Sequence, residues 1–247
     1  MRTIARLDIK NDYVIKGINF EGLRKVGKPV ELSSKYYEDG VDELLLLDSV
    51  ATLYSRGTLF DVIKKITEKI FIPVCVGGGI RSLKDIEMAL NSGADKVAIN
   101  SAIVKNISLL EEARKNFGAS NLVVSVEIKK NSNNWEIYVN NGRDKTGKYL
   151  KDWINQIQEV GCGEILITSI DSDGTKKGLN LDLLSHIKSI KTTVPLIFSG
   201  GIGNLEHVSE FLKIFPDEAL AIGSAFHYEL IKMKEIKKLY YEKNNNS

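Results

Sequence analysis

The chain carries the same strand-to-glycine pattern twice, and this repeat limits the possible folds more than any other feature. IPVCVGGGI fills residues 72–80, and VPLIFSGGIG fills residues 194–203, about 120 residues later. Each copy is followed by a second matching segment, VAINSAI at 97–103 and LAIGSAF at 220–226. Similarity at a fixed period indicates that one structural unit has been used twice. The repeat therefore predicts a fold made of two similar halves.

A third match sets the length of each half. DIKND at residues 8–12 resembles EIKKN at 127–131, again about 120 residues apart. Chance can explain one matching strand, but several elements that match in the same order favour a true repeat. We therefore place the halves at about residues 1–118 and 119–242, followed by a disordered tail at 243–247.

Short apolar runs alternate with amphipathic helical patterns almost to the end of the chain. Continuous apolar runs are typical of parallel strands that are covered by helices. Eight strand–helix units in about 250 residues match a (β/α)8 TIM barrel, whereas a doubly wound open sheet would not require eight. Because two matching halves of four units close naturally into one ring, we predict a single α/β barrel over residues 1–242. The expected strands span residues 3–9, 43–49, 72–77, 96–100, 122–127, 164–170, 195–199 and 219–223.

Small and polar residues follow four of the expected strands, two in each half. In such a barrel the reaction site lies where the strands end and the next loops begin. Glycines let backbone N–H groups approach a phosphate closely, and a serine hydroxyl adds one more donor. The same glycines would also suit tight turns that need a positive φ. Two such sites predict a substrate with phosphate at both ends, bound by Gly78, Gly79, Asn100 and Ser101 in the first half and by Gly200, Gly201, Gly223 and Ser224 in the second.

Two acidic residues stand between these sites. Asp8 ends the first strand and Glu127 ends the fifth, so they face each other across an eight-strand ring. Paired carboxylates at a barrel mouth suit general acid–base chemistry, although a lone carboxylate at a strand end is often a helix cap. After the sixth strand, Asp173 and Gly174 in DSDGT form either a plain turn or part of the second phosphate site. Asp48 ends the second strand and is expected to orient its neighbours.

Charged residues also occur at the starts of four strands, on the opposite face of the barrel. Strand starts of this kind are commonly just solvated. The alternative is a ring of paired charges that closes the bottom of the barrel. The four residues are Arg2, Glu43, Lys96 and Glu164.

The composition argues against several classes of protein. A net charge of +2, from 34 basic and 32 acidic residues, lacks the basic excess typical of nucleic-acid binding. No segment approaches the ~18 apolar residues of a membrane span, and the charged N-terminal segment is unlike a secretory signal. Cys75 and Cys162 suit reduced thiols, and the three histidines show no metal-ligand spacing. We therefore expect a cytoplasmic protein without a metal or other cofactor.

With these residues in view, the chain resembles HisF, the cyclase subunits of imidazole glycerol phosphate synthase, from about residue 3 to 240. The sister isomerase of the same pathway shares the barrel and the twin phosphate sites, but the KGINF loop and the DSDGTKKG segment resemble the cyclase. The most specific pieces are LDIKNDYVIKGINFEGLR (7–24), VGGGI…GADKVAINSA (76–102), GCGEILITSIDSDGTKKG (161–178) and SGGIGNLEHVSEF (199–211).

This resemblance implies a reaction. Ammonia and N′-[(5′-phosphoribulosyl)formimino]-5-aminoimidazole-4-carboxamide ribonucleotide would give imidazole glycerol phosphate and AICAR, the 5-aminoimidazole-4-carboxamide ribonucleotide, in histidine biosynthesis. Asp8 and Glu127 match the positions of the two catalytic aspartates, and Lys16 matches the lysine of the flexible loop after the first strand. The residues of the two phosphate sites match those of the family.

The resemblance also implies a partner. Arg2, Glu43, Lys96 and Glu164 match a charged gate at the barrel bottom, where the family docks a HisH-type glutaminase and passes ammonia through the barrel. Asp95 matches a residue of that contact surface. A conducting barrel departs from the rule that such interiors are packed solid, so the channel is implied by the family alone.

Several residues of the substrate face depart from the family pattern. Glu127 is one methylene longer than the family's aspartate, and a displacement of that order can cost ~100-fold in rate. Arg6 replaces a cysteine, Lys28 an acid and Asn141 a hydroxyl residue. These changes favour an alternative, a HisF-like subunit that channels ammonia from a glutaminase to an amidotransferase for acetamidino groups on surface sugars. A non-catalytic binding barrel is disfavoured by Asp8 and both phosphate sites.

Overall fold

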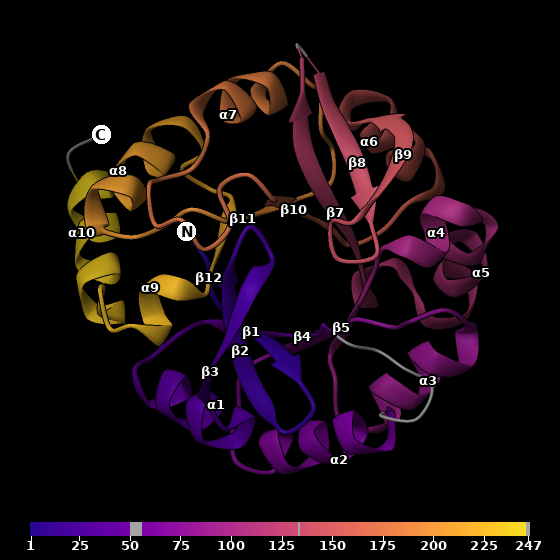
Figure 1. Cartoon of the computed structure of the whole chain (residues 1–247), viewed down its shortest axis with the longest axis horizontal. Coiled ribbons are helices and arrows are strands. Elements are labelled where there is room, and N and C mark those ends of the chain that lie inside the picture. The colour runs from indigo at the N-terminus through magenta and orange to yellow at the C-terminus, as the bar shows by residue number, and fades with distance from the viewer. Residues whose placement is uncertain (50–55, 133, 246–247) are drawn as a thin grey trace.

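The chain folds into a closed barrel of parallel strands surrounded by helices, as a computed structural model shows (Figure 1). The structure describes residues 1–49, 56–132 and 134–245. Pairing between β7 (Leu122–Asn131) and β10 (Glu164–Ser169) closes the ring. The predicted (β/α)8 barrel is therefore confirmed, and the open doubly wound sheet is excluded. Because the barrel strands are all parallel, their carboxyl ends meet at one mouth.

Each barrel strand begins within two residues of its predicted start. The other barrel strands are β1 (Thr3–Lys10), β4 (Glu43–Asp48), β5 (Val74–Gly77), β6 (Lys96–Ile99), β11 (Leu196–Ser199) and β12 (Ala219–Ile222). The helices are α1 (Pro29–Glu38), α2 (Arg56–Thr67), α3 (Leu83–Asn91), α4 (Ser101–Lys105), α5 (Ser108–Phe117), α6 (Leu150–Val160), α7 (Leu181–Lys188), α8 (Leu205–Ile214), α9 (Ser224–His227) and α10 (Met233–Asn245), with one 3-10 turn at Ala119–Asn121.

Side chains alternate along each barrel strand and so belong to two different cores. On β1, Ala5 and Leu7 belong to the large cluster between the barrel and the helices, whereas Ile4 belongs to a small inner cluster. Arg6 and Asp8 share the inward phase of Ile4 and follow it toward the mouth. The lower interior of the barrel is therefore apolar and the upper interior is polar. The inner cluster consists of Ile4, Leu45, Cys75, Ala98, Val123, Leu166, Ile197, Ala219 and Ala221.

Each half adds an antiparallel hairpin after its first strand, which the sequence pattern did not predict. In the first half, β2 (Tyr13–Ile18) pairs with the end of β1 and with β3 (Glu21–Gly27). In the second half, β8 (Asn134–Val139) pairs with the end of β7 and with β9 (Asp144–Tyr149). Figure 1 shows the two hairpins on different sides of the barrel opening. This shared feature supports our proposal that the barrel consists of two similar halves.

The C-terminal end differs from the prediction. Helix α10 continues to Asn245, so residues 243–245 are helical where the sequence suggested the start of a disordered tail. The run MKEIKKLYYEK is rich in residues that favour helix, which explains the extension. Residues 246–247 lie outside the described residues.

Candidate functional site

The mouth of the barrel contains a cavity of about 620 Å³. Its walls come from the carboxyl ends of the strands and from both hairpins, which is where a (β/α)8 barrel holds its chemistry. The structure brings together nine of the predicted site residues along this cavity. They are Asp8, Lys16, Asp48, Gly78, Gly79, Asn100, Ser101, Glu127 and Asp173.

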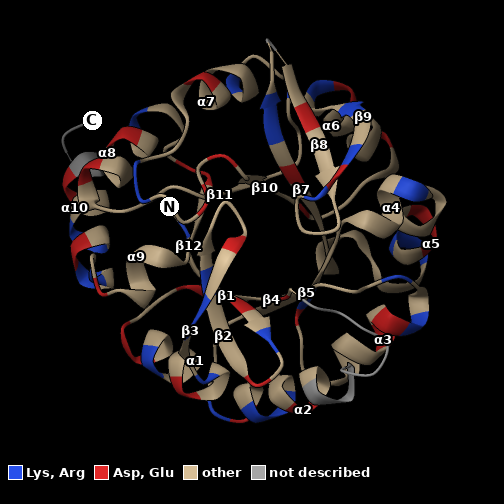
Figure 2. Cartoon of the chain, viewed as in Figure 1, with Lys and Arg blue, Asp and Glu red and all other residues tan. Residues whose placement is uncertain are grey.

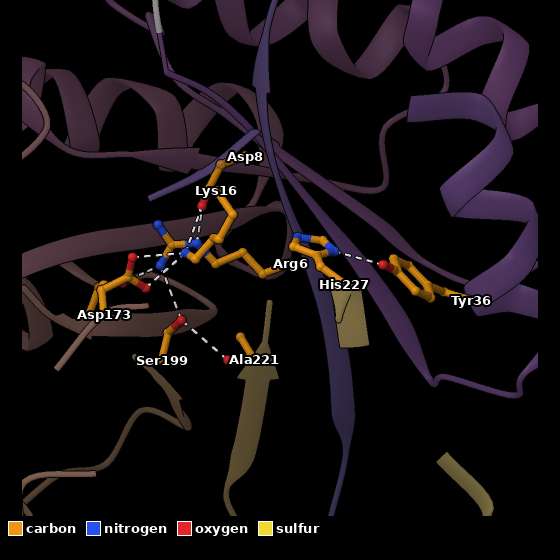
Figure 3. Close-up of polar contacts among 9 residues, drawn as sticks. Arg6, Asp8, Lys16, Tyr36, Asp173, Ser199, Ala221 and His227 are labelled. Atoms are coloured by element: carbon orange, nitrogen blue, oxygen red, sulfur yellow. Dashed lines mark hydrogen bonds and ion pairs between the residues drawn. The ribbon is translucent and has the colours of Figure 1, made fainter. Parts of the chain in front are cut away.

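Asp8 lies in a buried network of charges in the first half of the mouth (Figure 3). Lys16 reaches down from β2, and its Nζ donates to Asp8 Oδ2 at 3.0 Å and to Asp173 Oδ2 at 2.8 Å. Arg6 Nε donates to Asp8 Oδ1 at 2.9 Å. Both oxygens of Asp8 therefore accept hydrogen bonds from cations.

These cations determine the protonation state of Asp8. Burial alone would raise the pKa of its carboxyl group, but the charges and hydrogen bonds of Arg6 and Lys16 outweigh burial and hold the pKa well below its usual range. Opposite charges at such short distances favour the ionised carboxylate. Asp8 is thus a fixed anion at neutral pH.

Glu127 lines the same cavity but has a different environment. Its Oε2 accepts a hydrogen bond from the backbone N–H of Gly142 at 2.9 Å. Burial raises the pKa of Glu127 to about 7, because the Gly142 N–H and the more distant charge of Arg6 offset burial only in part, and the charge of Asp8 adds to it. A carboxyl group with this pKa can donate or accept a proton near neutral pH.

The predicted phosphate site of the first half consists of tight turns and polar side chains. Gly78 has φ +92°, and a Cβ there would lie 2.2 Å from the carbonyl oxygen of Asp48. The hydroxyl of Ser101 accepts from the backbone N–H of Asn140 at 3.1 Å. Asn100 Oδ1 is buried without a hydrogen-bond partner among the described residues, so it could accept from a donor of a ligand but not bind a phosphate oxygen.

The second half has the same kind of turns, but a hairpin covers them. A Cβ on Gly201 would lie 2.0 Å from the carbonyl oxygen of Gly178, and one on Gly174 would lie 2.0 Å from that of Gly17. Lys16 Nζ lies 3.7 Å from a Cβ built on Gly223. None of Gly174, Gly200, Gly201, Gly223 and Ser224 lines the open cavity. Gly174 and Gly201 are thus required by backbone contacts, whether or not they also bind phosphate, whereas a Cβ on Gly223 would meet no closer backbone atom than 3.4 Å.

Ser224 nevertheless keeps an unused donor in this covered region. It is buried, and its Oγ has no hydrogen-bond partner among the described residues. One turn further along α9, His227 Nδ1 and Tyr36 Oη are 2.6 Å apart, and burial lowers the pKa of His227 to about 4. His227 is therefore neutral. Because His227 follows Ser224 by three residues, the two side chains lie on the same side of the helix, and this spacing could have placed His227 near the site.

The four charged residues at the barrel bottom form a closed ring. Arg2 pairs with Glu43 at 3.5 Å and also with Glu164, and Lys96 pairs with Glu43 at 3.1 Å and with Glu164 at 2.7 Å. Each charge therefore has two opposite neighbours, and the reading of a merely solvated rim is wrong. Asp95 lies beside this ring, exposed, with its Oδ2 accepting from the N–H of Val74 at 2.8 Å.

The hydrogen bonds of Arg6 are the main feature of the site that sequence reasoning missed, since the sequence showed this residue only as a departure from the family pattern. The residue is 4 % exposed, and its side chain lines the cavity between the inner apolar cluster and Asp8. Its Nη1 donates to Thr168 and Ser199, both at 3.1 Å. The alternation along β1 could have placed Arg6 inside the barrel, but its partners are far away in the sequence.

The described parts of the outer surface and of the helices give no sign of a second kind of site. Figure 2 shows basic and acidic segments interspersed around the outer helices. Among the residues that the structure describes, none of the helices has the length and apolar character needed to cross a bilayer. The same residues contain no group of three or more His, Cys, Asp or Glu side chains that could hold a metal ion.

The fold and the site define a (β/α)8-barrel enzyme with paired carboxyl groups at the carboxyl ends of its strands. Comparison with known proteins then gives the family. Residues 2–232 match the model of the family described as histidine biosynthesis protein, and the chain belongs to this family.

Within the family, the chain is similar to proteins named imidazole glycerol phosphate synthase subunit HisF. It is 45% identical to the one from Helicobacter hepaticus over 243 residues, which cover 98% of this chain and 96% of the relative. It is 44% identical to the one from Wolinella succinogenes over 239 residues (96% and 93%) and 43% identical to the one from Sulfurisphaera tokodaii over 242 residues (98% and 96%).

Proposed function

We propose that this chain is the cyclase subunit of imidazole glycerol phosphate synthase and acts in histidine biosynthesis. It uses ammonia to convert the bisphosphorylated ribulosyl-formimino-AICAR ribonucleotide into imidazole glycerol phosphate and AICAR. One observation carries the assignment of roles. The cavity at the barrel mouth is lined by two carboxyl groups whose pKa values are shifted in opposite directions, Asp8 downward and Glu127 to about 7. Such pairs mark acid–base assignments.

The chemistry needs both kinds of group. Ammonia attacks the ketone carbon of the ribulosyl part, water leaves, and the nitrogen then attacks the formimino carbon while the bond to the amine of AICAR breaks. The sum is substrate plus ammonia giving imidazole glycerol phosphate, AICAR and one water. Loss of water and departure of the amine each need a proton, which Glu127 supplies. The fixed anion of Asp8 stabilises the positive charge of the iminium stage.

The two ends of the substrate are held by the two sets of turns. In the first half, Gly78, Gly79, Asn100 and Ser101 surround one phosphate. In the second half, Ser224 and the backbone around Gly174, Gly200, Gly201 and Gly223 hold the other. The unused hydroxyl of Ser224, which can donate to a phosphate oxygen, supports the second of these sites. Lys16 Nζ lies 3.7 Å from a Cβ built on Gly223, so its positive charge is close to the second phosphate.

We place the partner at the other end of the barrel. A HisH-type glutaminase would contact the face that carries Asp95 and the ring of Arg2, Glu43, Lys96 and Glu164. Neutral ammonia, unlike ammonium, would pass the apolar inner cluster above the ring without a large desolvation cost. A Lys96→Met variant should therefore impair glutamine-dependent turnover more than turnover with added ammonia.

The remaining parts of the proposal follow from the reaction. A cytoplasmic location fits a biosynthetic subunit, and the chemistry above uses only side chains and needs no cofactor. The alternative, ammonia delivery to an amidotransferase that forms acetamidino groups on sugars, would use the same ring and the same inner cluster. The two functions differ in the acceptor of the ammonia: the cyclase uses it on a substrate bound at the barrel mouth, whereas the alternative passes it on to the amidotransferase.

The test uses the purified chain, ammonium at alkaline pH and the bisphosphorylated ribonucleotide. Loss of substrate is followed by ultraviolet absorbance, and products are identified by mass spectrometry. Formation of imidazole glycerol phosphate and AICAR is the expected result. No turnover, while a glutaminase still binds, would contradict the cyclase function and support ammonia delivery to another acceptor.

A further inference from the structure

A guanidinium group forms the floor of the cavity. The inward side chains of β1 are Ile4, Arg6 and Asp8, from bottom to top. Ile4 belongs to the apolar cluster and does not line the cavity, whereas Arg6 and Asp8 both line it. Arg6 is therefore the deepest β1 side chain that a ligand in this cavity can meet.

The hydrogen bonds of Arg6 leave part of its donor set unused. A guanidinium carries five N–H donors in a planar fork. Nε donates to Asp8, and Nη1 donates to Thr168 and Ser199. None of the hydrogen bonds that Arg6 makes to described residues uses Nη2. Asp8, Thr168 and Ser199 fix the plane of the group, so the two donors of Nη2 have a defined direction before a ligand arrives.

The charge around Arg6 selects the kind of group that Nη2 can bind. The buried network contains two cations, Arg6 and Lys16, and two carboxylates, Asp8 and Asp173. With Glu127 protonated, the network is neutral. A further carboxylate or phosphate at the floor would be a buried charge without a counter-ion of its own. A neutral oxygen acceptor, such as the carbonyl of an amide, satisfies the donors without this cost.

We propose that Arg6 is a substrate-binding residue that recognises a neutral carboxamide in the middle of the ligand, through Nη2. Under the proposed function, on which the identity of the group rests, this is the 4-carboxamide of the AICAR part. The contact determines specificity because a ligand without the carbonyl leaves two buried donors unpaired. It also places the middle of the substrate between Asp8 and Glu127.

The test compares two nucleotides that differ only in this group, AICAR and 5-aminoimidazole ribonucleotide, by isothermal titration. The wild-type chain should bind AICAR about 10–100-fold more tightly, the range expected for hydrogen bonds to a charged group. Arg6→Met should reduce this preference to within about threefold and leave the binding of 5-aminoimidazole ribonucleotide nearly unchanged. Arg6→Lys keeps the charge but loses the planar fork, so its preference should be intermediate.

Two further variants separate recognition from folding. Arg114→Met removes an exposed arginine of α5 and should keep the wild-type preference. If Arg6→Met does not fold, the double variant Arg6→Met, Asp8→Asn removes both charges of the pair and takes its place. A purely structural role for Arg6 would weaken the binding of both nucleotides equally.

The outcomes also distinguish this inference from the proposed function. An Arg6-dependent preference in a chain that does not turn over the bisphosphorylated substrate supports the inference and contradicts the cyclase function. Turnover with equal affinity for the two nucleotides supports the function and overturns the inference. Lack of binding of both nucleotides to the wild-type chain also overturns it.

Discussion

Asp8 and Glu127 occupy equivalent positions in the two halves of the barrel, yet their surroundings are opposite. Each lies at the mouth on the first strand of its half, just before an antiparallel hairpin. Two residues earlier, β1 presents Arg6 to the cavity, whereas β7 presents Ser125. The first hairpin adds the cation of Lys16, but the second adds only a backbone N–H. The two halves therefore supply carboxyl groups with pKa values shifted in opposite directions.

This contrast shows that position in the barrel does not determine chemistry. A strand end brings a carboxyl group to the mouth, and the neighbours then set its pKa. Asp8 is ionised because cations contact both of its oxygens, and the pKa of Glu127 is raised to about 7 because burial is only partly offset. The following changes test the two sides of this comparison.

The largest effect is expected from Asp8→Asn. The change removes the anion but keeps the shape, so turnover with ammonia should fall by ~1,000-fold or more, while circular dichroism still shows a folded barrel. Substrate binding should weaken much less than the rate. An Asp8→Asn variant with near-normal turnover would refute the role of Asp8.

Lys16→Met should have the next largest effect. It leaves Asp8 and Asp173 without their shared cation, so the pKa of Asp8 should rise, turnover should fall by ~100-fold, and the free energy of unfolding should fall by about 3 kcal/mol. Steady-state kinetics and chemical denaturation measure the two quantities. Lys25→Met, on exposed β3 of the same hairpin, is the matched control and should change neither turnover nor the free energy of unfolding.

Glu127 should control the pH dependence of the reaction. If Glu127 acts as the acid, kcat/KM at a constant concentration of free ammonia falls as pH rises through about 7, where Glu127 loses its proton. Glu127→Gln should be slower by ~100-fold, and its remaining rate should no longer change across that range. A wild-type rate that rises through pH 7 would instead make Glu127 a base.

Glu127→Asp tests whether the longer side chain limits the rate. Shortening the acid restores the residue type of the resembled family, so turnover should rise severalfold if the cyclase reaction is retained. An unchanged or lower turnover would mean that the cavity is built around the contact between Glu127 and Gly142.

The last prediction concerns stability. The pKa of Glu127 is higher in the folded chain, about 7, than the ordinary value of 4.5. Its contribution to stability is therefore fully present below pH 4.5 and is lost as pH rises through about 7. Between pH 4.5 and pH 8, the free energy of unfolding of Glu127→Gln should therefore rise by about 3 kcal/mol relative to that of the wild type. Thermal unfolding at the two pH values measures this difference.

The fold and the positions at the strand ends could be predicted because they depend on local patterns. The repeat of glycine turns and the apolar runs predicted the closed barrel, and the strand ends predicted that Asp8 and Glu127 would share one cavity. The hairpins were missed because the residues that follow β1 and β7 were read only as loops. Lys16 was assigned to the site from the resemblance alone. Only the folded hairpin brings its side chain to Asp173, which lies 157 residues away in the sequence.

The bonds of Arg6 could not be predicted for a related reason. Its partners Thr168 and Ser199 lie 162 and 193 residues away, and a burial-driven pKa such as that of Glu127 requires the assembled cavity. The bottom ring was left between two interpretations because sequence cannot show whether charges at strand starts meet. In the structure they do.

The most direct test of the central claim is a titration of the two carboxyl groups by carbon-13 NMR, with labelled aspartate and glutamate and with Asp8→Asn and Glu127→Gln to assign the signals. We predict that Glu127 titrates near pH 7 and that Asp8 stays ionised over the whole range in which the chain is folded. A Glu127 signal that titrates near 4.5, together with an Asp8 signal that titrates near 4, would contradict the account, because the two halves would then hold equivalent acids.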